Sequence, residues 1–225
     1  MGDIIDTSPD AYLVTRALRE LDGRLPEDFP HMDINVVGGF ALQVLKVRTD
    51  VNQATDLDYI GKPLPASVMR VVDEVGLQFG LDPKWFNNDV LLAGYTSVAD
   101  IEGATGPLTF IPNAVPGLRH FTVAVADAKS ILRMKLVAID TQLVTYLDDA
   151  FRSDFTRGKD LADISLLAAY LRMTEQGVAQ LVADMGAAGI LLAPIETCAV
   201  ALAAIRGLGE PEALQAARRA VPDTM

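Results

Sequence analysis

The hydrophobic positions in the first half of the chain recur with two different periods. Apolar residues at helical spacing over 12–24, preceded by Ser8 and Pro9 as helix-start residues, predict a helix. Short β-branched or alternating runs at 34–37, 57–60, 108–111 and 121–125 predict strands. Segments 40–46 and 65–79 have helical spacing, whereas 82–106 supports no assignment. The first half therefore predicts strands interleaved with helices.

From residue 127 onward the pattern is helical. Helices are predicted at 128–138, 141–151, 160–171, 175–185, 196–206 and 211–220, with glycine or proline between most of them. We therefore expect an α+β protein in two domains. Residues 1–126 would form a small mixed β-sheet core with flanking helices, and residues 127–225 a helical C-terminal domain.

A Gly-Gly pair and an Asp-Leu-Asp triplet stand beside two of the predicted strands. Gly38 and Gly39 follow the strand at 34–37 and open a helix, so their backbone N–H groups can hold phosphate oxygens. Asp56 and Asp58 project from one face of a strand, where they repel each other unless a cation lies between them. Mg²⁺ prefers such oxygen ligands. The order predicts phosphoryl or nucleotidyl transfer; a plain turn and a solvated strand face are the alternatives.

Three segments together resemble the nucleotidyltransferase superfamily related to DNA polymerase beta. The closer likeness is to the small bacterial toxin nucleotidyltransferases of the abortive-infection type II (AbiEii-like) group. It extends over roughly residues 33–170. The matching motifs are Gly38-Gly39 with Arg48-Thr49 or Thr55 and Asp56-Leu57-Asp58, then the segment 131–138 around Lys135, then the segment 157–164 around Asp160.

The resemblance implies roles for these residues. Asp56 and Asp58 would hold Mg²⁺ or Mn²⁺, and Gly38, Gly39 and Thr55 would bind a nucleoside triphosphate. Lys135 would contact its phosphates and Asp160 would lie close to the metal, so that the helical domain completes the site. Lys135 could instead be a surface lysine, and Asp160 could cap the N-terminus of a helix. For Asp163 the capping role is the favoured interpretation.

The implied activity is transfer of a nucleotidyl group to an acceptor hydroxyl, on a tRNA end, a protein or a small molecule. A protein with this activity could be the toxin of a toxin–antitoxin pair, and its partner would then be an antitoxin protein. Three departures favour a catalytically weak binding or regulatory module instead. Sixteen residues separate Gly39 from Asp56, Phe40 follows the glycines in place of serine, and the strands at 108–111 and 121–125 carry no third carboxylate. Asp89 is the nearby substitute.

Composition limits the partners. A net charge of −11 repels nucleic acid, so RNA would need a local basic strip. Candidates for that strip are Arg133, Lys135, Arg152, Arg157 and Lys159. No apolar run approaches the roughly 20 residues of a membrane span, and the N-terminus lacks the features of a signal peptide. A single cysteine, Cys198, argues against disulfides, so we expect a cytoplasmic protein.

Overall fold

The computed structural model describes residues 12–49, 54, 56–61, 63–88, 97–145 and 158–221. Its contacts divide the chain into two compact units. Unit 1 comprises Met1–Asp100 and Leu108–Asp127, and unit 2 comprises Ile101–Pro107 and Ala128–Met225. The segment 101–107 thus packs with the C-terminal helices. That residues 1–126 and 127–225 are separate domains stays a prediction.

Unit 1 contains a five-stranded mixed sheet in the order β3-β2-β1-β5-β4. Its strands β1 and β5 are parallel, as are β2 and β3, whereas β1–β2 and β4–β5 are antiparallel. The mixed sheet and the surrounding helices confirm the α+β class. The strand bounds are β1 (Met32–Val37), β2 (Leu57–Ile60), β3 (Phe86–Asn87), β4 (Phe110–Ile111) and β5 (Phe121–Ala126).

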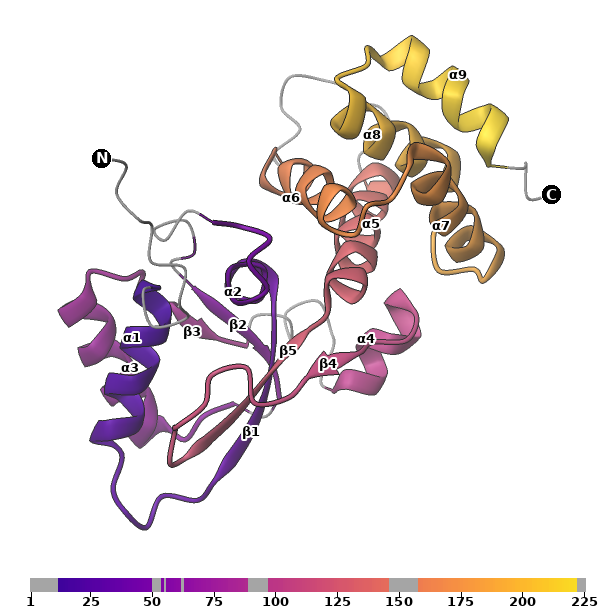
Figure 1. The fold of residues 1–225 in the computed structure, drawn as a ribbon. Helices are drawn as coiled ribbons and strands as arrows, with labels where there is room; N and C mark the ends of the chain where they lie inside the picture. Colours follow the sequence, from indigo (N-terminus) through magenta and orange to yellow (C-terminus); the bar gives the residue numbers. More distant parts are fainter. Residues whose placement is uncertain are drawn as a thin grey trace, which may run out of the picture. The chain divides into compact units, whose positions relative to one another are not determined.

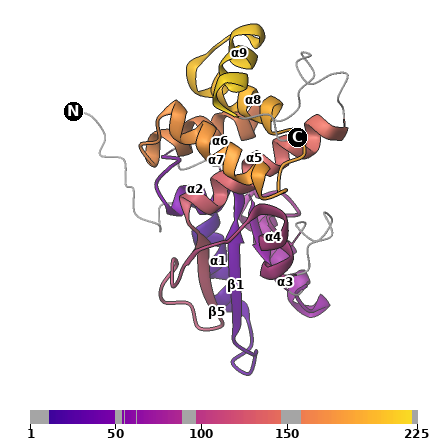
Figure 2. The ribbon, with the colours of Figure 1, turned by 90° about the vertical axis from the view of Figure 1, so that its right-hand side faces the viewer.

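One face of this sheet forms the core of unit 1. The register pairs Ile34 with Val123 and Val36 with Val125, and all four side chains are buried. Because side chains alternate along a strand, Asn35 on β1 and Ala124 on β5 lie on the other face and are less buried. At the ends of the two strands, Val37 and Ala126 are buried as well. The helices α1 (Leu13–Arg24) and α3 (Ala66–Phe79) lie side by side on one side of the sheet (Figures 1 and 2).

A buried tryptophan joins α3 to the sheet. Trp85 is fully buried, and its indole Nε1 donates a hydrogen bond to the carbonyl oxygen of Val72, 2.8 Å away. The ring packs so closely that a Cβ added at Gly76 would lie 2.6 Å from its Cδ1. Glycine at position 76 therefore lets the helix approach the ring. Trp85 is therefore a core aromatic residue.

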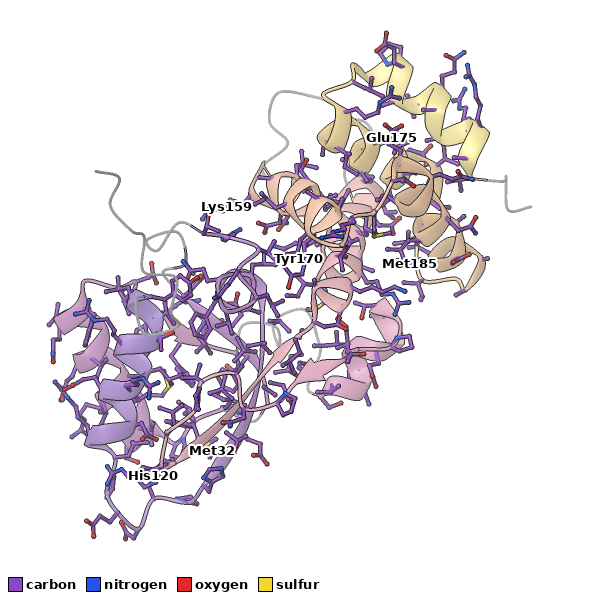
Figure 3. The ribbon with its side chains drawn as sticks, in the orientation of Figure 1. Met32, His120, Lys159, Tyr170, Glu175 and Met185 are labelled. Carbon is purple, nitrogen blue, oxygen red and sulfur yellow. The ribbon has the colours of Figure 1, made fainter. Side chains whose placement is uncertain are left out.

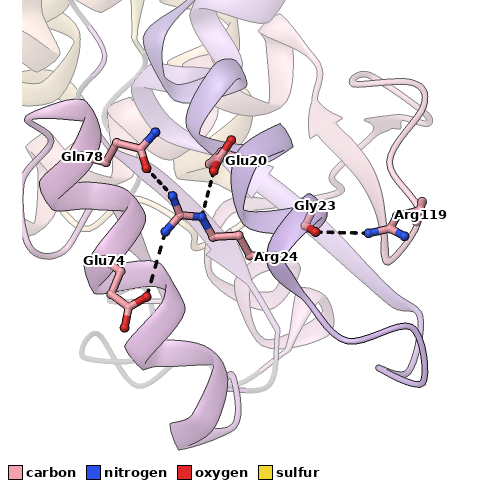
Figure 4. Close-up of polar contacts among 6 residues, drawn as sticks. All are labelled: Glu20, Gly23, Arg24, Glu74, Gln78 and Arg119. Atoms are coloured by element: carbon pink, nitrogen blue, oxygen red, sulfur yellow. Dashed lines mark hydrogen bonds and ion pairs between the residues drawn. The ribbon is translucent and has the colours of Figure 1, made fainter.

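Polar contacts fasten α1 to its neighbours (Figure 4). The Arg24 guanidinium donates to the Glu20 carboxylate and to the side chain of Gln78 on α3. The buried Asp22 carboxylate accepts hydrogen bonds of 2.8 Å from the backbone N–H groups of Arg119 and His120. Asp22 thus holds the loop that leads into β5. His120 in turn accepts a backbone bond from Met32 at the start of β1 (Figure 3).

Unit 2 is helical and is built around one apolar helix. The residues from Thr197 to Leu202 of α8 are all buried, and α8 packs against α5, α6, α7 and α9. Burial raises the pKa of the Cys198 thiol on this helix to about 11, so the thiol is inert at neutral pH. The bounds are α5 (Ala128–Thr145), α6 (Gly158–Tyr170), α7 (Glu175–Ala187), α8 (Pro194–Arg206) and α9 (Glu210–Ala220).

Two predicted helical segments are joined in α5. The helix continues without a break from 128–138 through Asp140 to Thr145; residues 146–157 lie outside the described part of the chain. Asp140 is buried and accepts hydrogen bonds from the backbone N–H groups of Leu192 and Ala193, at 2.9 and 2.8 Å. Its carboxylate also accepts from the Thr197 hydroxyl. It therefore holds the two residues that lead into α8, together with Thr197 in its first turn.

The segment 82–106, which supports no assignment from sequence, contains two elements. They are the two-residue strand β3 and the helix α4 (Val98–Thr105), whose C-terminal half belongs to unit 2. The helix α2 (Gly38–Val44) begins two residues earlier than the sequence predicts. Among the helices that the structure describes, none is long and apolar enough to cross a membrane.

Candidate functional site

The turn between β1 and α2 brings Asp58 against the backbone of Gly38. Val37 and Asp58 are register partners on the antiparallel strands β1 and β2. A Cβ added at Gly38 would lie 2.5 Å from Oδ2 of Asp58. Gly38 also has a φ of +71°, which favours glycine. Glycine at position 38 is therefore favoured for two independent reasons, the positive φ and the approach of the Asp58 carboxylate.

Asp56 and Asp58 alternate with buried apolar residues. Leu57 and Tyr59 are almost completely buried, whereas Asp56 and Asp58 are half-buried. Burial raises the pKa of the Tyr59 hydroxyl, and its ring lies 5.1 Å from that of Phe86. This burial pattern is typical of a strand with one face in the core. It supports the prediction that the two carboxylates share a face, beside the Gly-Gly turn.

Arg48 lies against the second glycine. A Cβ added at Gly39 would lie 3.0 Å from Nη1 of Arg48. The backbone turns back after α2, with Lys46 at a φ of 59° and the Arg48 N–H donating to the carbonyl oxygen of Leu42. The half-buried Arg48 guanidinium therefore lies at the turn. In the sequence, Arg48 is identified only as part of the motif that carries the family resemblance, and no pattern predicts its contact with Gly39.

The neighbouring strands offer no third carboxylate in register with Asp58. Its partner on β3 is Asn87, and its partner on β1 is Val37. Within the described ranges, no group of three or more histidine, cysteine or acidic side chains could hold a metal ion. Asp89 and Thr55 lie outside those ranges. Two carboxylates fit Mg²⁺, which commonly takes one or two from the protein and fills its shell with water and phosphate oxygens.

The predicted residues Lys135 and Asp160 come together in unit 2. Nζ of Lys135 on α5 forms an ion pair with Asp160 and a second one, at 3.0 Å, with Asp163; both carboxylates belong to α6. Asp160 is 8% exposed and Asp163 is 1% exposed. Burial acts to lower the pKa of Lys135, but the two carboxylates outweigh it and raise the pKa. The lysine therefore stays charged and links α5 to α6.

The residues of the predicted basic strip have different surroundings. Nη1 of Arg133 donates to the carbonyl oxygen of Pro107 at 2.9 Å, and Lys135 is held by its two carboxylates. Lys159 is exposed near the start of α6 (Figure 3). Arg152 and Arg157 lie outside the described residues. Arg133 and Lys135 thus make contacts within unit 2.

The chain matches no protein-family model, no curated protein and no solved structure. The functional argument therefore depends on the arrangement of Gly38, Gly39, Arg48, Asp56 and Asp58.

Proposed function

We propose that the protein is a nucleotidyltransferase that uses Mg²⁺ or Mn²⁺ and a nucleoside triphosphate. The observation that carries the proposal is the approach of the Asp58 carboxylate to Gly38, where a Cβ would lie 2.5 Å from Oδ2. This contact joins the two sequence motifs, the Gly-Gly turn and the Asp-Leu-Asp triplet, at one place. Carboxylate oxygens for a metal and backbone groups for phosphate are the two features that such chemistry needs.

In the proposed reaction an acceptor hydroxyl attacks the α-phosphorus of the triphosphate. A new oxygen–phosphorus bond forms, the bond from the α-phosphorus to the oxygen bridging to the β-phosphate breaks, and pyrophosphate leaves. The hydroxyl proton passes to water. A bound Mg²⁺ would neutralise charge on the phosphates. Asp56 and Asp58 would hold it, and the Gly38-Gly39 turn would orient the triphosphate.

The acceptor would be a tRNA end, a protein side chain or a small molecule. The net charge of −11 gives no long-range attraction for RNA. A protein or small-molecule acceptor fits this charge better. A toxin paired with an antitoxin protein, acting in the cytoplasm, is the form of this function that the family resemblance favours.

Thermal unfolding tests the metal site. We expect Mg²⁺ with a nucleoside triphosphate to raise the melting temperature, because a ligand that binds only the folded state stabilises it. The double variant Asp56→Asn, Asp58→Asn should lose this rise. The matched control, Asp33→Asn with Asp73→Asn, removes two exposed carboxylates from unit 1 and should keep it. An equal rise in both double variants would refute the proposed site.

The alternative, a binding or regulatory module without catalysis, has one observation in its favour. The register partner of Asp58 on β3 is the amide Asn87, which cannot accept a proton from the acceptor hydroxyl. Incubation of the protein with each labelled triphosphate, Mg²⁺ and total tRNA separates the two functions. Transfer of label, to tRNA or to protein, supports the enzyme. Triphosphate binding without pyrophosphate release supports the module.

A further inference from the structure

We infer that the Arg48 guanidinium binds phosphate oxygens of the substrate at the Gly38-Gly39 turn. The inference rests on the proposed function and adds to it a residue that contacts the substrate.

The space beside residue 39 is occupied by the arginine. Nη1 of Arg48 lies 3.0 Å and Cζ 3.9 Å from the position that a Cβ of Gly39 would take. Gly39 has no positive φ, so its backbone does not itself require glycine. Glycine at position 39 thus leaves the room that the guanidinium takes in this arrangement.

A negative and a positive side chain lie next to each other along the turn, as do the cation and the anionic oxygens of a metal–phosphate ligand. The Asp58 carboxylate lies against Gly38 and the Arg48 guanidinium lies against the next residue, Gly39. A bound Mg²⁺–phosphate ligand presents a cation and anionic oxygens side by side. The carboxylate and the guanidinium lie against successive glycines, Gly38 and Gly39, and match these two charges. Metal and phosphate would then be recognised by Asp58 and Arg48 beside the same turn.

Guanidinium suits this role chemically. It remains protonated, it is planar, and its N–H groups can donate two parallel hydrogen bonds to one phosphate. The residue after the glycines cannot replace it, because Phe40 is apolar and fully buried. Arg48 is half-buried, so part of its side chain is open to a ligand. The departure from serine after the glycines is thereby compensated by a residue eight positions further on.

Calorimetric titration with Mg²⁺-tripolyphosphate and with Mg²⁺-nucleoside triphosphate tests the contact. Arg48→Ala should weaken both affinities about tenfold or more, since a hydrogen bond to a charged group is lost. Arg48→Lys should recover only part, because an ammonium group cannot donate in the bidentate arrangement. The matched control is Arg70→Ala, which removes an exposed arginine from α3 and should bind as the wild type does.

A second variant keeps the test sharp if Arg48→Ala fails to fold. Gly39→Ala leaves Arg48 in place but displaces the end of its flexible side chain, so it should weaken binding to a similar extent. Wild-type affinity in Gly39→Ala would overturn the inference. If Arg48→Ala does fold, the double variant Gly39→Ala, Arg48→Ala should lose no more than either single variant, because both remove the same contact, and additive losses would overturn the inference as well.

The outcomes separate the inference from the function on which it rests. Wild-type protein that binds Mg²⁺-triphosphate, together with Arg48→Ala protein that binds it equally well, would overturn the role of Arg48 and leave the proposed function standing. Wild-type protein that binds neither ligand would overturn both. Weaker binding by Arg48→Ala but not by Arg70→Ala would support the inference.

Discussion

The two units each contain a pair of close aspartates, and the pairs differ in what lies against them. In unit 2, Asp160 and Asp163 are one helical turn apart and both contact the ammonium of Lys135. In unit 1, Asp56 and Asp58 are two residues apart on an extended chain, and Asp58 lies against the backbone of Gly38. The first pair is matched by a lysine from another helix. The second lies at a turn where glycine leaves room.

The difference bears on the roles that we propose for the two pairs. Buried like charges are costly unless a partner of opposite charge accompanies them, and Lys135 supplies one for the pair in unit 2. The carboxylates of unit 1 are half-buried, so water can solvate them and a metal ion can reach them. The family resemblance implies that Lys135 and Asp160 belong to the substrate site, and this stays a prediction. In the structure their ion pair, with that of Asp163, links α5 to α6.

Loss of Lys135 should have the largest effect on stability. Lys135→Met would leave two buried carboxylates without their cation, which should cost about 3 kcal/mol of the free energy of unfolding. The measurement is urea unfolding at pH 7. Lys129→Met, at an exposed position on the same helix, is the control and should change little. Equal losses in the two variants would contradict the structural role of the ion pairs.

The same ion pairs predict a dependence on alkaline pH. The pKa of Lys135 is raised in the folded state, so its contribution is complete below the ordinary lysine pKa of 10.5. It is lost as the pH rises through the folded pKa, because the folded state then releases the proton that stabilised it. The stability difference between wild type and Lys135→Met should therefore shrink above pH 10.5. A difference that grows there would refute this linkage.

Substitution of Gly38 should have an intermediate effect. Gly38→Ala places a side chain at positive φ, which costs about 1 kcal/mol, and also forces the Asp58 carboxylate to move. Gly80→Ala is a close control, because Gly80 has a φ of 64° and nothing within 4 Å of the added Cβ. Unfolding measurements should show a larger loss for Gly38→Ala. Equal losses would mean that the approach of Asp58 imposes no constraint.

The smallest effect should come from the aspartates of unit 1. Asp56→Asn and Asp58→Asn should each lower the free energy of unfolding without ligand by less than Lys135→Met does, because neither leaves a fully buried charge behind. The same variants should lose the stabilisation by Mg²⁺-triphosphate. A loss comparable to that of Lys135→Met would mean that this pair, too, is structural.

Most elements could be predicted from the sequence because their signals are local. The strand at 57–60 has the predicted bounds, and the helices α6 to α9 begin and end within two residues of their predicted positions. The break predicted after residue 138 is wrong, because α5 continues to Thr145. The elements in the segment 82–106 could not be predicted from the sequence, for a physical reason. The strand β3 is two residues long, too short for any periodicity, and it exists because it pairs with β2.

The candidate site could be predicted only in part. Gly38, Gly39, Asp56 and Asp58 carry a recognisable order and spacing in the sequence. The contact of Arg48 with Gly39 has no such signal, since it depends on the turn at Lys46 that brings the chain back. The role of Asp140 has no sequence signal either, because the backbone N–H groups that donate to it lie 52 and 53 residues away.

By itself, the sequence determined the alternation that buries Leu57 and Tyr59 and leaves Asp56 and Asp58 half-buried. It also determined the place of the glycines at the end of β1. The tertiary structure decided which charges meet: Lys135 with Asp160 and Asp163, Arg48 with the turn, and Asp58 with Gly38. Periodicity and backbone freedom act between neighbouring residues, whereas ion pairs and close approaches need segments that folding alone brings within a few ångströms.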